Sequence, residues 1–258
     1  MTAVAWAVSD HWEMAKRSLR HIRNDPEQLG NVTMTPVLTV LLMTFVFGGA
    51  IKTGTHGSYI NFAMPGIFAA VAAFAAVTTT IGVAADMRQG VMDRLRTLPI
   101  AKSSVVTGHV LADLARSLIG LAATVAVGYA VGFRPSAGPG GWAIAVAMIL
   151  LLTFALSWVA ALIGVLGTSL EVAQQLAAIV VIPVFLSSAV VPTATMPSWL
   201  RLVTANQPIT QAIDTLRAEL AGQPPGSHLW LALTELAGII VIAFTLATAL
   251  FRRRAASA

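Results

Sequence analysis

The stretch GWAIAVAMILLLTFALSWVAALIGVL, residues 141–166, contains no charged side chain. An α-helix rises about 1.5 Å per residue, so this stretch is long enough to cross the ~30 Å hydrocarbon core of a bilayer. Its continuous apolar runs are incompatible with the strands of a membrane barrel, which alternate apolar and polar residues. The stretch therefore predicts a transmembrane helix.

Five further apolar stretches predict that the chain is an all-α integral membrane protein with six transmembrane helices. Gly, Ala, Ser and Thr within these stretches are typical of helices that pack closely in lipid. We treat residues 1–258 as one transmembrane domain, in which residues 1–32 and 252–258 are tails and residues 192–228 are an outer helical segment. The predicted spans are Thr33–Ile51, Asn61–Ala85, Ser117–Phe133, Gly141–Leu166, Gln174–Val191 and Leu229–Phe251.

The basic residues predict the orientation of the chain. An even number of spans places both termini on one side, and twelve of the sixteen Lys and Arg lie in the two tails or around the connection between spans two and three. Such residues stay in the cytoplasm, so both termini are predicted to be cytoplasmic and the chain to be a multi-pass protein of the inner (plasma) membrane. The net charge of +5 follows from this topology and requires no nucleic acid. No cleavable signal is expected before the first span.

The sequence contains no catalytic constellation. There is no Cys, and the five His are scattered without metal-ligand spacing. Gly167-Thr168-Ser169-Leu170 lacks the second glycine of a G-x-S-x-G turn, which argues against an intramembrane protease. None of the three Lys follows a glycine, so the chain has no phosphate-binding G-x-x-x-x-G-K-[ST] loop. We therefore expect a non-enzyme with no catalytic residue, no metal site and no cofactor of its own.

Ionisable groups are expected to be nearly absent from the membrane core. A charge there costs several kcal/mol, and its absence disfavours a proton- or sodium-coupled transporter. Glu235, about two turns into the last span, is the exception: it is either an aqueous-facing, snorkelling carboxylate or a polar contact in a substrate path. Five other charged residues are expected in loops or near the inner helix ends, namely Asp86, Asp93, Asp113, Arg116 and Glu171. The simplest interpretation is a permease or pore whose energy source lies outside this chain.

Two cytoplasmic elements are predicted to be amphipathic helices. Before the first span, Trp12 and Leu19 belong to an apolar stripe flanked by Lys16 and Arg23, with Arg20 on the polar side, which predicts a helix in the inner interface. It is a plain anchor, a contact for a cytoplasmic partner, or both. Between spans two and three, Met87, Val91, Leu95 and Leu98 share one face of a short helix that Pro99 ends, with Asp93, Arg94 and Arg96 at its sides. That helix either docks in a groove of another protein or is a basic stop signal.

The outer segment is predicted to contain two helices. At 37 residues it is too long for an unstructured connection in a compact protein. One helix begins near Ser198 and the other at Pro208. The second places Ile209, Ile213, Leu216 and Leu220 on one face, with Asp214 and Arg217 opposite.

Hydroxyl groups on otherwise apolar spans are candidates for a substrate path. These are Thr78, Thr79, Thr80, Ser187 and Ser188. The alternative is structural, because Ser and Thr hydroxyls commonly bond back to their own helix or join neighbouring spans.

Several short motifs occur in order along the chain: Arg23-Asn-Asp-Pro26, Tyr59–Gly66, Gly90–Ile100, Gly132-Phe133-Arg134, Glu171–Gln174, Phe185–Ser188, Met196–Leu200 and Asn206–Thr210, followed by Arg217. Together, at these positions, they make the chain resemble the permease subunit of ABC type-2 exporters, in the branch typified by daunorubicin-resistance permeases. The chain departs from many relatives at Ser187-Ser188-Ala189, where they have a glycine after the serine.

This resemblance implies a six-helix domain that works in pairs, through its first and fifth helices, with a copy of itself or a sibling permease. A separate cytoplasmic ABC ATPase would bind ATP and Mg. The region 86–98 matches the coupling helix, so the implied coupling residues are Met87, Arg88, Val91, Asp93, Arg94, Leu95, Arg96 and Leu98. The implied function is export of a hydrophobic or amphipathic drug, polyketide or glycolipid. The alternatives are a non-transporting membrane scaffold and a stand-alone secondary transporter.

Overall fold

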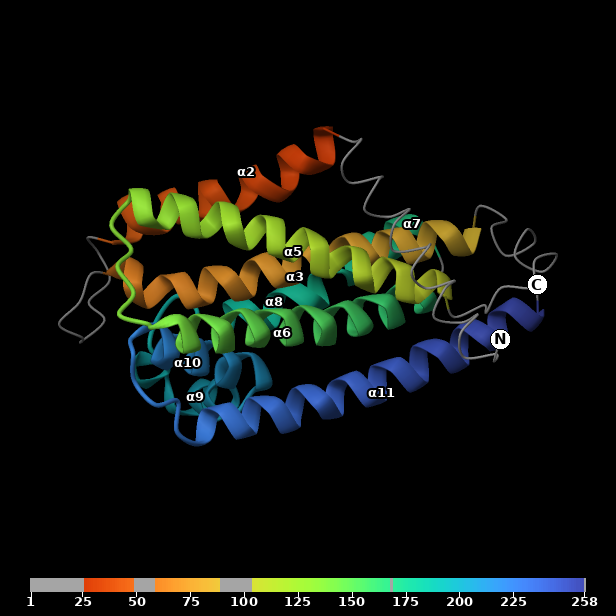
Figure 1. Cartoon of the computed structure of the whole chain (residues 1–258). Coiled ribbons are helices and arrows are strands. Elements are labelled where there is room, and N and C mark those ends of the chain that lie inside the picture. The colour runs from red at the N-terminus through yellow and green to blue at the C-terminus, as the bar shows by residue number, and fades with distance from the viewer. Residues whose placement is uncertain (1–25, 49–58, 89–103, 168, 258) are drawn as a thin grey trace, which may run out of the picture.

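The computed structural model describes residues 26–48, 59–88, 104–167 and 169–257, and these residues form helices and connections without any strand (Figure 1). The all-α prediction is therefore confirmed for this part of the chain. The predicted N-terminal interfacial helix lies outside it, and so does the predicted helix between spans two and three beyond Arg88. The elements are α2 (Pro26–Leu42), the π-helix η1 (Met43–Phe47), α3 (Tyr59–Arg88), α5 (Ser104–Ala130), α6 (Pro139–Leu166), α7 (Leu170–Leu176), α8 (Ala178–Phe185), the 3₁₀ turn η2 (Thr193–Thr195), α9 (Ser198–Ala205), α10 (Pro208–Leu220) and α11 (Ser227–Ser257).

Four helices in the described part of the chain are long and apolar enough to cross a membrane: α3, α5, α6 and α11. The predicted spans one and five fall on shorter apolar segments, Thr33–Phe47 and Leu170–Phe185. Each is interrupted, the first by the change to a π-helix at Met43 and the second between α7 and α8. At 1.5 Å per residue each segment covers only about 23 Å, less than the hydrocarbon core.

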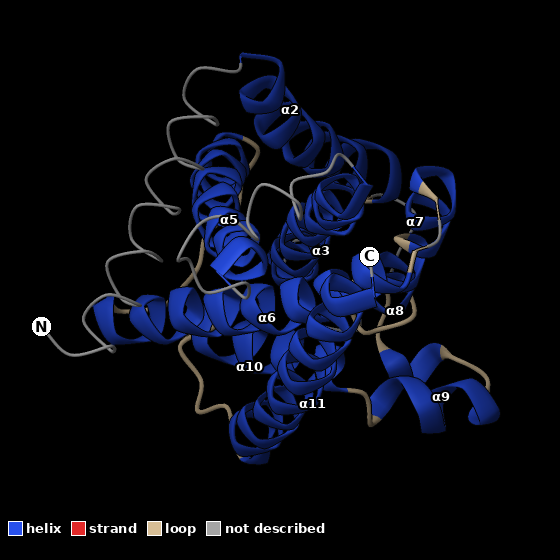
Figure 2. Cartoon of the chain, turned by 90° about the vertical axis from the view of Figure 1, so that its right-hand side faces the viewer, coloured by secondary structure: helices blue, strands red, loops and turns tan. Residues whose placement is uncertain are grey.

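Helix α3 occupies the centre of the bundle, with α2, α5, α6 and α8 around it (Figure 2). Within its most apolar window 72% of the residues are buried, against 17% for α11, which lies along one side of the bundle (Figure 1). Small residues allow the close contacts of α3. A Cβ on Gly164 of α6 would lie 2.7 Å from the Thr80 carbonyl oxygen, and a Cβ on Gly66 would lie 2.5 Å from the Ala189 Cα. Close backbone approach of this kind drives helix packing in lipid, where apolar burial does not.

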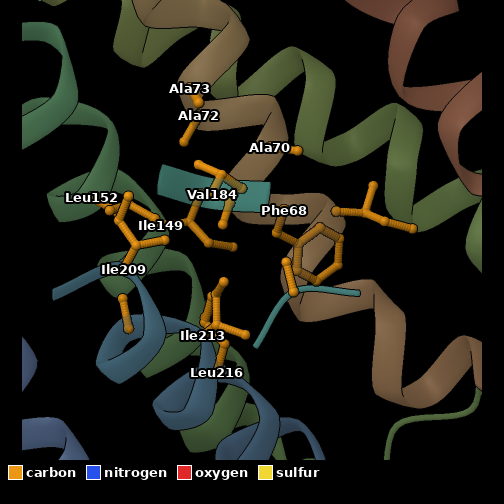
Figure 3. Close-up of a cluster of buried hydrophobic side chains, with 14 of the residues drawn as sticks. Phe68, Ala70, Ala72, Ala73, Ile149, Leu152, Val184, Ile209, Ile213 and Leu216 are labelled. Atoms are coloured by element: carbon orange, nitrogen blue, oxygen red, sulfur yellow. The ribbon is translucent and has the colours of Figure 1, made fainter. Parts of the chain in front are cut away.

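Helix α10 belongs to the core of the bundle. The helices α9 and α10 begin at Ser198 and Pro208, as predicted, and the predicted apolar face of α10 is buried. Figure 3 shows Ile209, Ile213 and Leu216 of this face pointing toward Ile149 of α6 and Val184 of α8. By contrast α9 exposes Trp199, Leu202 and Val203. The outer segment therefore consists of one helix that seals the end of the bundle and one that lies on its surface.

Candidate functional site

A buried carboxylate joins three of the long helices. Asp113 of α5 is fully buried, and its Oδ2 accepts hydrogen bonds from Thr79 Oγ1 of α3 at 2.6 Å and from Ser157 Oγ of α6 at 2.7 Å. Its Oδ1 forms an ion pair with Nη1 of Arg116. The Thr78 hydroxyl lies 3.3 Å from the same Oδ1, donates to the Ala75 carbonyl at 2.7 Å, and accepts a 2.8 Å bond from Arg116. We call Thr78, Thr79, Asp113, Arg116 and Ser157 the Asp113 cluster.

This cluster corrects the expectation that the spans hold no ionisable group except Glu235. Asp113 and Arg116 were expected near the inner end of a span that began at Ser117, but α5 begins at Ser104 and its apolar window runs from Val106 to Ala130. The physical reason is mutual compensation. A paired, hydrogen-bonded carboxylate and guanidinium can be buried, although an isolated charge cannot. Helix α5 therefore continues through Asp113 and Arg116, although the predicted span begins only after them, at Ser117.

Further hydroxyls of α3, α5 and α6 bond across helix interfaces. Thr80 Oγ1 donates to the Ala160 carbonyl at 3.1 Å, and Ser117 Oγ lies 2.8 Å from Thr153 Oγ1. Thr79 and Thr80 are fully buried inside the subunit, whereas Thr78 is exposed and lines a cavity. Hydroxyls that join neighbouring helices are what the structural alternative to a substrate path predicts. A substrate-path role for Thr78, Thr79 and Thr80 stays a prediction.

Ser187 and Ser188 lie in a second polar cluster, just after the end of α8. Ser187 Oγ donates to the Val184 carbonyl, and Ser188 Oγ donates to Asp214 Oδ1 at 2.8 Å. Arg217 of α10 forms an ion pair with Asp214 and donates from Nη2 to the Ser188 carbonyl at 2.7 Å. Its guanidinium lies 4.0 Å from the centroid of the Phe62 ring, an arrangement that favours a cation–π interaction. Ser187 and Ser188 are buried. Their predicted role in a substrate path also stays a prediction.

This second cluster satisfies the backbone at the end of α8. The last carbonyls of a helix have no partner within the helix itself. Gln207 Nε2 donates to the carbonyls of Pro183 and Leu186 at 3.1 and 2.7 Å. Burial lowers the pKa of the Arg217 guanidinium, and the adjacent Asp214 opposes that shift. Asp214 and Arg217, predicted to lie opposite the apolar face of α10, contact the turn after α8 and hold it in place.

Large apolar side chains face outward from α2, η1 and α8. Met34, Leu38, Phe45 and Val46 are 57–73% exposed, and Ile179, Ile182 and Phe185 are 50–52% exposed. A small cavity lies between these elements and α3, beside Gly66 and Ala189. Helix α11 presents a second apolar face with Val241, Ile242 and Phe244. Together with the exposed apolar residues of α9, these faces are suited to lipid or to another apolar protein surface.

The described ends of α3 and α5 are joined beside the predicted coupling region. Asp86 Oδ2 lies 2.7 Å from His109 Nε2, and the His109 ring packs against Gly82 so closely that a Cβ there would lie 2.7 Å from it. Met87 packs against an apolar cluster that includes Val83 and Val106. Arg88 is the last residue of α3, and the other predicted coupling residues, Val91 to Leu98, lie outside the described residues, as do Trp12, Lys16, Leu19, Arg20 and Arg23.

Glu235 lies on α11, and its Oε2 atom is buried without a hydrogen-bond partner among the described residues. Within the same part of the chain there is no group of His, Asp and Glu side chains arranged to hold a metal ion. The polar chemistry that the structure describes inside the bundle is thus concentrated in the Asp113 cluster and in the cluster around Arg217.

Comparison with known families matches the description "ABC-2 type transporter" over residues 10–220. The chain belongs to the ABC-2 type transporter family. Its match spans α2 to α10, the elements that carry both polar clusters, and it confirms the resemblance found in the motifs. Members of this family are transport subunits and are not themselves catalytic.

Two relatives of this ABC-2 chain are drug-resistance permeases. It is 29% identical over 254 residues to the daunorubicin resistance ABC transporter permease protein DrrB1 of Streptomyces coeruleorubidus, a match that covers 98% of this chain and 88% of the relative. It is 26% identical over 211 residues to the probable doxorubicin resistance ABC transporter permease protein DrrC of Mycobacterium tuberculosis, covering 80% and 75%. The similarity therefore extends over most of each protein.

The role of Asp113 and Arg116 in this ABC-2 bundle was not predicted. A signal was present: the two residues are three positions apart, the spacing at which side chains meet on a helix, and no proline or glycine pair lies between Ser104 and Ala130. The Asp113 partners Thr79 and Ser157 lie 34 and 44 positions away from it in sequence. No local pattern predicts that pairing, because it depends on how three helices are rotated against one another.

Proposed function

We propose that this chain is the permease subunit of an ATP-driven exporter that moves a hydrophobic or amphipathic compound, such as a drug, polyketide or glycolipid, out of the cytoplasm or the inner leaflet. The family match over residues 10–220 carries the proposal. The two relatives are described as resistance permeases for daunorubicin and doxorubicin, which supports a cargo of amphipathic drug type.

We propose further that all six apolar segments cross the inner membrane, with both termini in the cytoplasm. Segments Thr33–Phe47 and Leu170–Phe185 would be spans one and five. Irregular backbone at membrane depth is tolerated where protein groups satisfy it, and Gln207 and Arg217 supply such groups at the end of α8. This accounts for a span that is too short to reach across the bilayer as one regular helix.

The working unit would be a pair of permeases that meet through α2 and α8. Helices α2 and α8 both pack against α3 (Figure 2), and each carries exposed apolar side chains that a partner permease could cover. The chain has no Cys, which makes cross-linking a direct test. Ile182→Cys on α8 is expected to form disulfide-linked dimers in membranes, and Ile242→Cys, similarly exposed on α11, is the control. Equal cross-linking of both variants would contradict this pairing.

Energy would come from a separate cytoplasmic ABC ATPase that binds ATP and Mg. The chain has no phosphate-binding loop of its own, and the predicted coupling residues begin with the last two residues of α3 and continue in the sequence after it. The experiment is co-purification in mild detergent with an ABC ATPase encoded beside it, followed by measurement of ATP hydrolysis with and without drug. A stable complex whose ATPase responds to drug supports an exporter. A chain that binds no ATPase, or a complex indifferent to every drug tested, supports the membrane-scaffold alternative.

A further inference from the structure

A cavity of about 210 Å³ lies between α2, α3 and α5, beside the Asp113 cluster. Most of its wall is apolar, formed by Pro36 of α2 and by Val71, Phe74 and Ala75 of α3. Phe74 is 38% exposed, so the cavity opens to the outside of the bundle alongside α3. Its volume exceeds the ~150 Å³ of an apolar cavity that binds benzene. The cavity can therefore hold an apolar group rather than only water.

One end of this cavity is formed by Arg116. A guanidinium carries five N–H groups, and the two on Nη1 are used by Thr78 and Asp113. The three on Nε and Nη2 have no acceptor among the described residues. The side chain is only 12% exposed, so bulk water reaches little of it. Among the described residues no Arg116 nitrogen is both buried and unpartnered, so these donors remain accessible from the cavity. An acceptor brought by a ligand can therefore bond to them in a place that little water reaches.

The polar groups at the cavity select the charge of that ligand. Asp113 has no free oxygen, because Thr79 and Ser157 bind Oδ2 and Arg116 binds Oδ1. The carboxylate is also fully buried behind Arg116. A cationic ligand would thus meet a guanidinium and only neutral acceptors, the hydroxyls of Thr35 and Thr78, whereas an anionic oxygen would meet three unused donors. Arg116 can bind a carboxylate or a phosphate through two parallel hydrogen bonds.

The depth of the site fits a molecule that enters from the bilayer. Arg116 is about 15 Å along the apolar window that begins at Val106. A charged group this far inside a span must face protein, a water-filled cavity or a ligand. The apolar wall continues from Arg116 toward Pro36 and Phe74, which places an apolar chain next to the anionic group.

We propose that this cavity binds an anionic amphiphile, with its carboxylate or phosphate at Arg116 and its apolar chain against α2 and α3. Such an anion has two possible sources, the headgroup of a membrane phospholipid or an acidic cargo. Binding of a lipid headgroup does not depend on the proposed export function. Only the interpretation of the ligand as an acidic cargo rests on the proposed export function. A direct binding measurement on the permease therefore separates failure of this proposal from failure of the transport proposal.

The test uses full-length protein in nanodiscs of zwitterionic phosphatidylcholine and a photoactivatable palmitate as the probe. Labelling is mapped by mass spectrometry to peptides of α2 and α3. Palmitate is expected to compete, whereas methyl palmitate and hexadecylamine are expected to compete at least about tenfold less well, because each lacks the charge that a guanidinium–anion bond requires. Nanodiscs containing anionic phosphatidylglycerol distinguish the sources. Reduced labelling there assigns the site to a lipid headgroup, and unchanged labelling assigns it to an acidic amphiphile other than lipid.

Two variants separate the site from the fold. Ala75→Phe adds an aromatic ring to the cavity wall and leaves Arg116 unchanged in the sequence, and Ala237→Phe makes the same change at an exposed position of α11. We expect Ala75→Phe to reduce labelling at least about tenfold and Ala237→Phe to leave it unchanged. The double variant Asp113→Leu with Arg116→Met removes both charges together and is expected to lose the preference for palmitate over its methyl ester. Equal labelling of the two Phe variants, or equal competition by the acid, ester and amine, would overturn the proposal.

Discussion

Arg116→Met removes the counter-charge of a carboxylate that is fully enclosed by three helices. Asp113 would keep its bonds from Thr79 and Ser157 but would lose its ion pair in a place that water does not reach. Removing one partner of a buried ion pair typically costs about 3–5 kcal/mol, because the remaining charge is left uncompensated. The structure therefore predicts strong destabilisation from a substitution that keeps a long, unbranched side chain and removes the charge and the hydrogen-bond donors.

The double variant Asp113→Leu with Arg116→Met gives a sharper expectation. Replacing a buried ion pair by apolar residues of similar size is often neutral or stabilising, so the double variant should be more stable than either single variant. The measurement is the midpoint of thermal unfolding in mild detergent, followed by fluorescence-detected size exclusion. At about 2–4 °C per kcal/mol, Arg116→Met should lower the midpoint by roughly 6–20 °C, and the double variant should recover most of that loss.

Additive effects would refute this reasoning. If the double variant loses the sum of the two single losses, the residues do not interact, and the contact between Asp113 and Arg116 does not exist in the folded protein. Ser117→Ala serves as a matched control. Ser117 lies on the same helix and is also buried, but its hydroxyl bonds only to Thr153, so we expect a loss of about 1 kcal/mol and no coupling to Arg116.

Three further substitutions test the packing, the end of α8 and the coupling region. Gly164→Ala should destabilise the bundle by about 1–3 kcal/mol in the same thermal assay, because its Cβ would lie 2.7 Å from the Thr80 carbonyl oxygen. Gly140→Ala on the same helix is the control and should be neutral, because the space around Gly140 is open. Arg217→Ala should cost about 2–4 kcal/mol through loss of the bonds to Asp214 and the Ser188 carbonyl, and Arg201→Ala, an exposed arginine of α9, should leave the midpoint unchanged. Leu95→Asp, or reversal of both charges at Arg94 and Arg96, should uncouple ATP hydrolysis from drug export in vesicles while membrane insertion stays intact, and unchanged export would contradict a docking role.

Much of the fold could be read from hydropathy and helix signals. Residues 141–166 correspond to α6 within two residues, and Pro208 begins α10, because apolar length and a proline at the first helical turn act locally. The apolar face of α10 was also predicted, since its period follows from helix geometry. Two boundaries were wrong: that of α5, and that of the fifth span, which was predicted to reach Val191 although α8 ends at Phe185. Asp113 and Arg116 look like a helix end when each charge is considered alone, and they become tolerable inside the bundle only as a pair with hydroxyl partners.

The sequence by itself determined that the chain is helical, apolar and related to ABC-2 permeases, because these properties depend on composition, local spacing and motif order. Only the tertiary structure decided which polar groups meet. It brought Thr79, Asp113 and Ser157 together from three helices, and it turned Arg116 toward a cavity while Arg217 faced the end of α8. The reason is that helix rotation and tilt are set by close packing at residues such as Gly66 and Gly164, and no single segment encodes that arrangement.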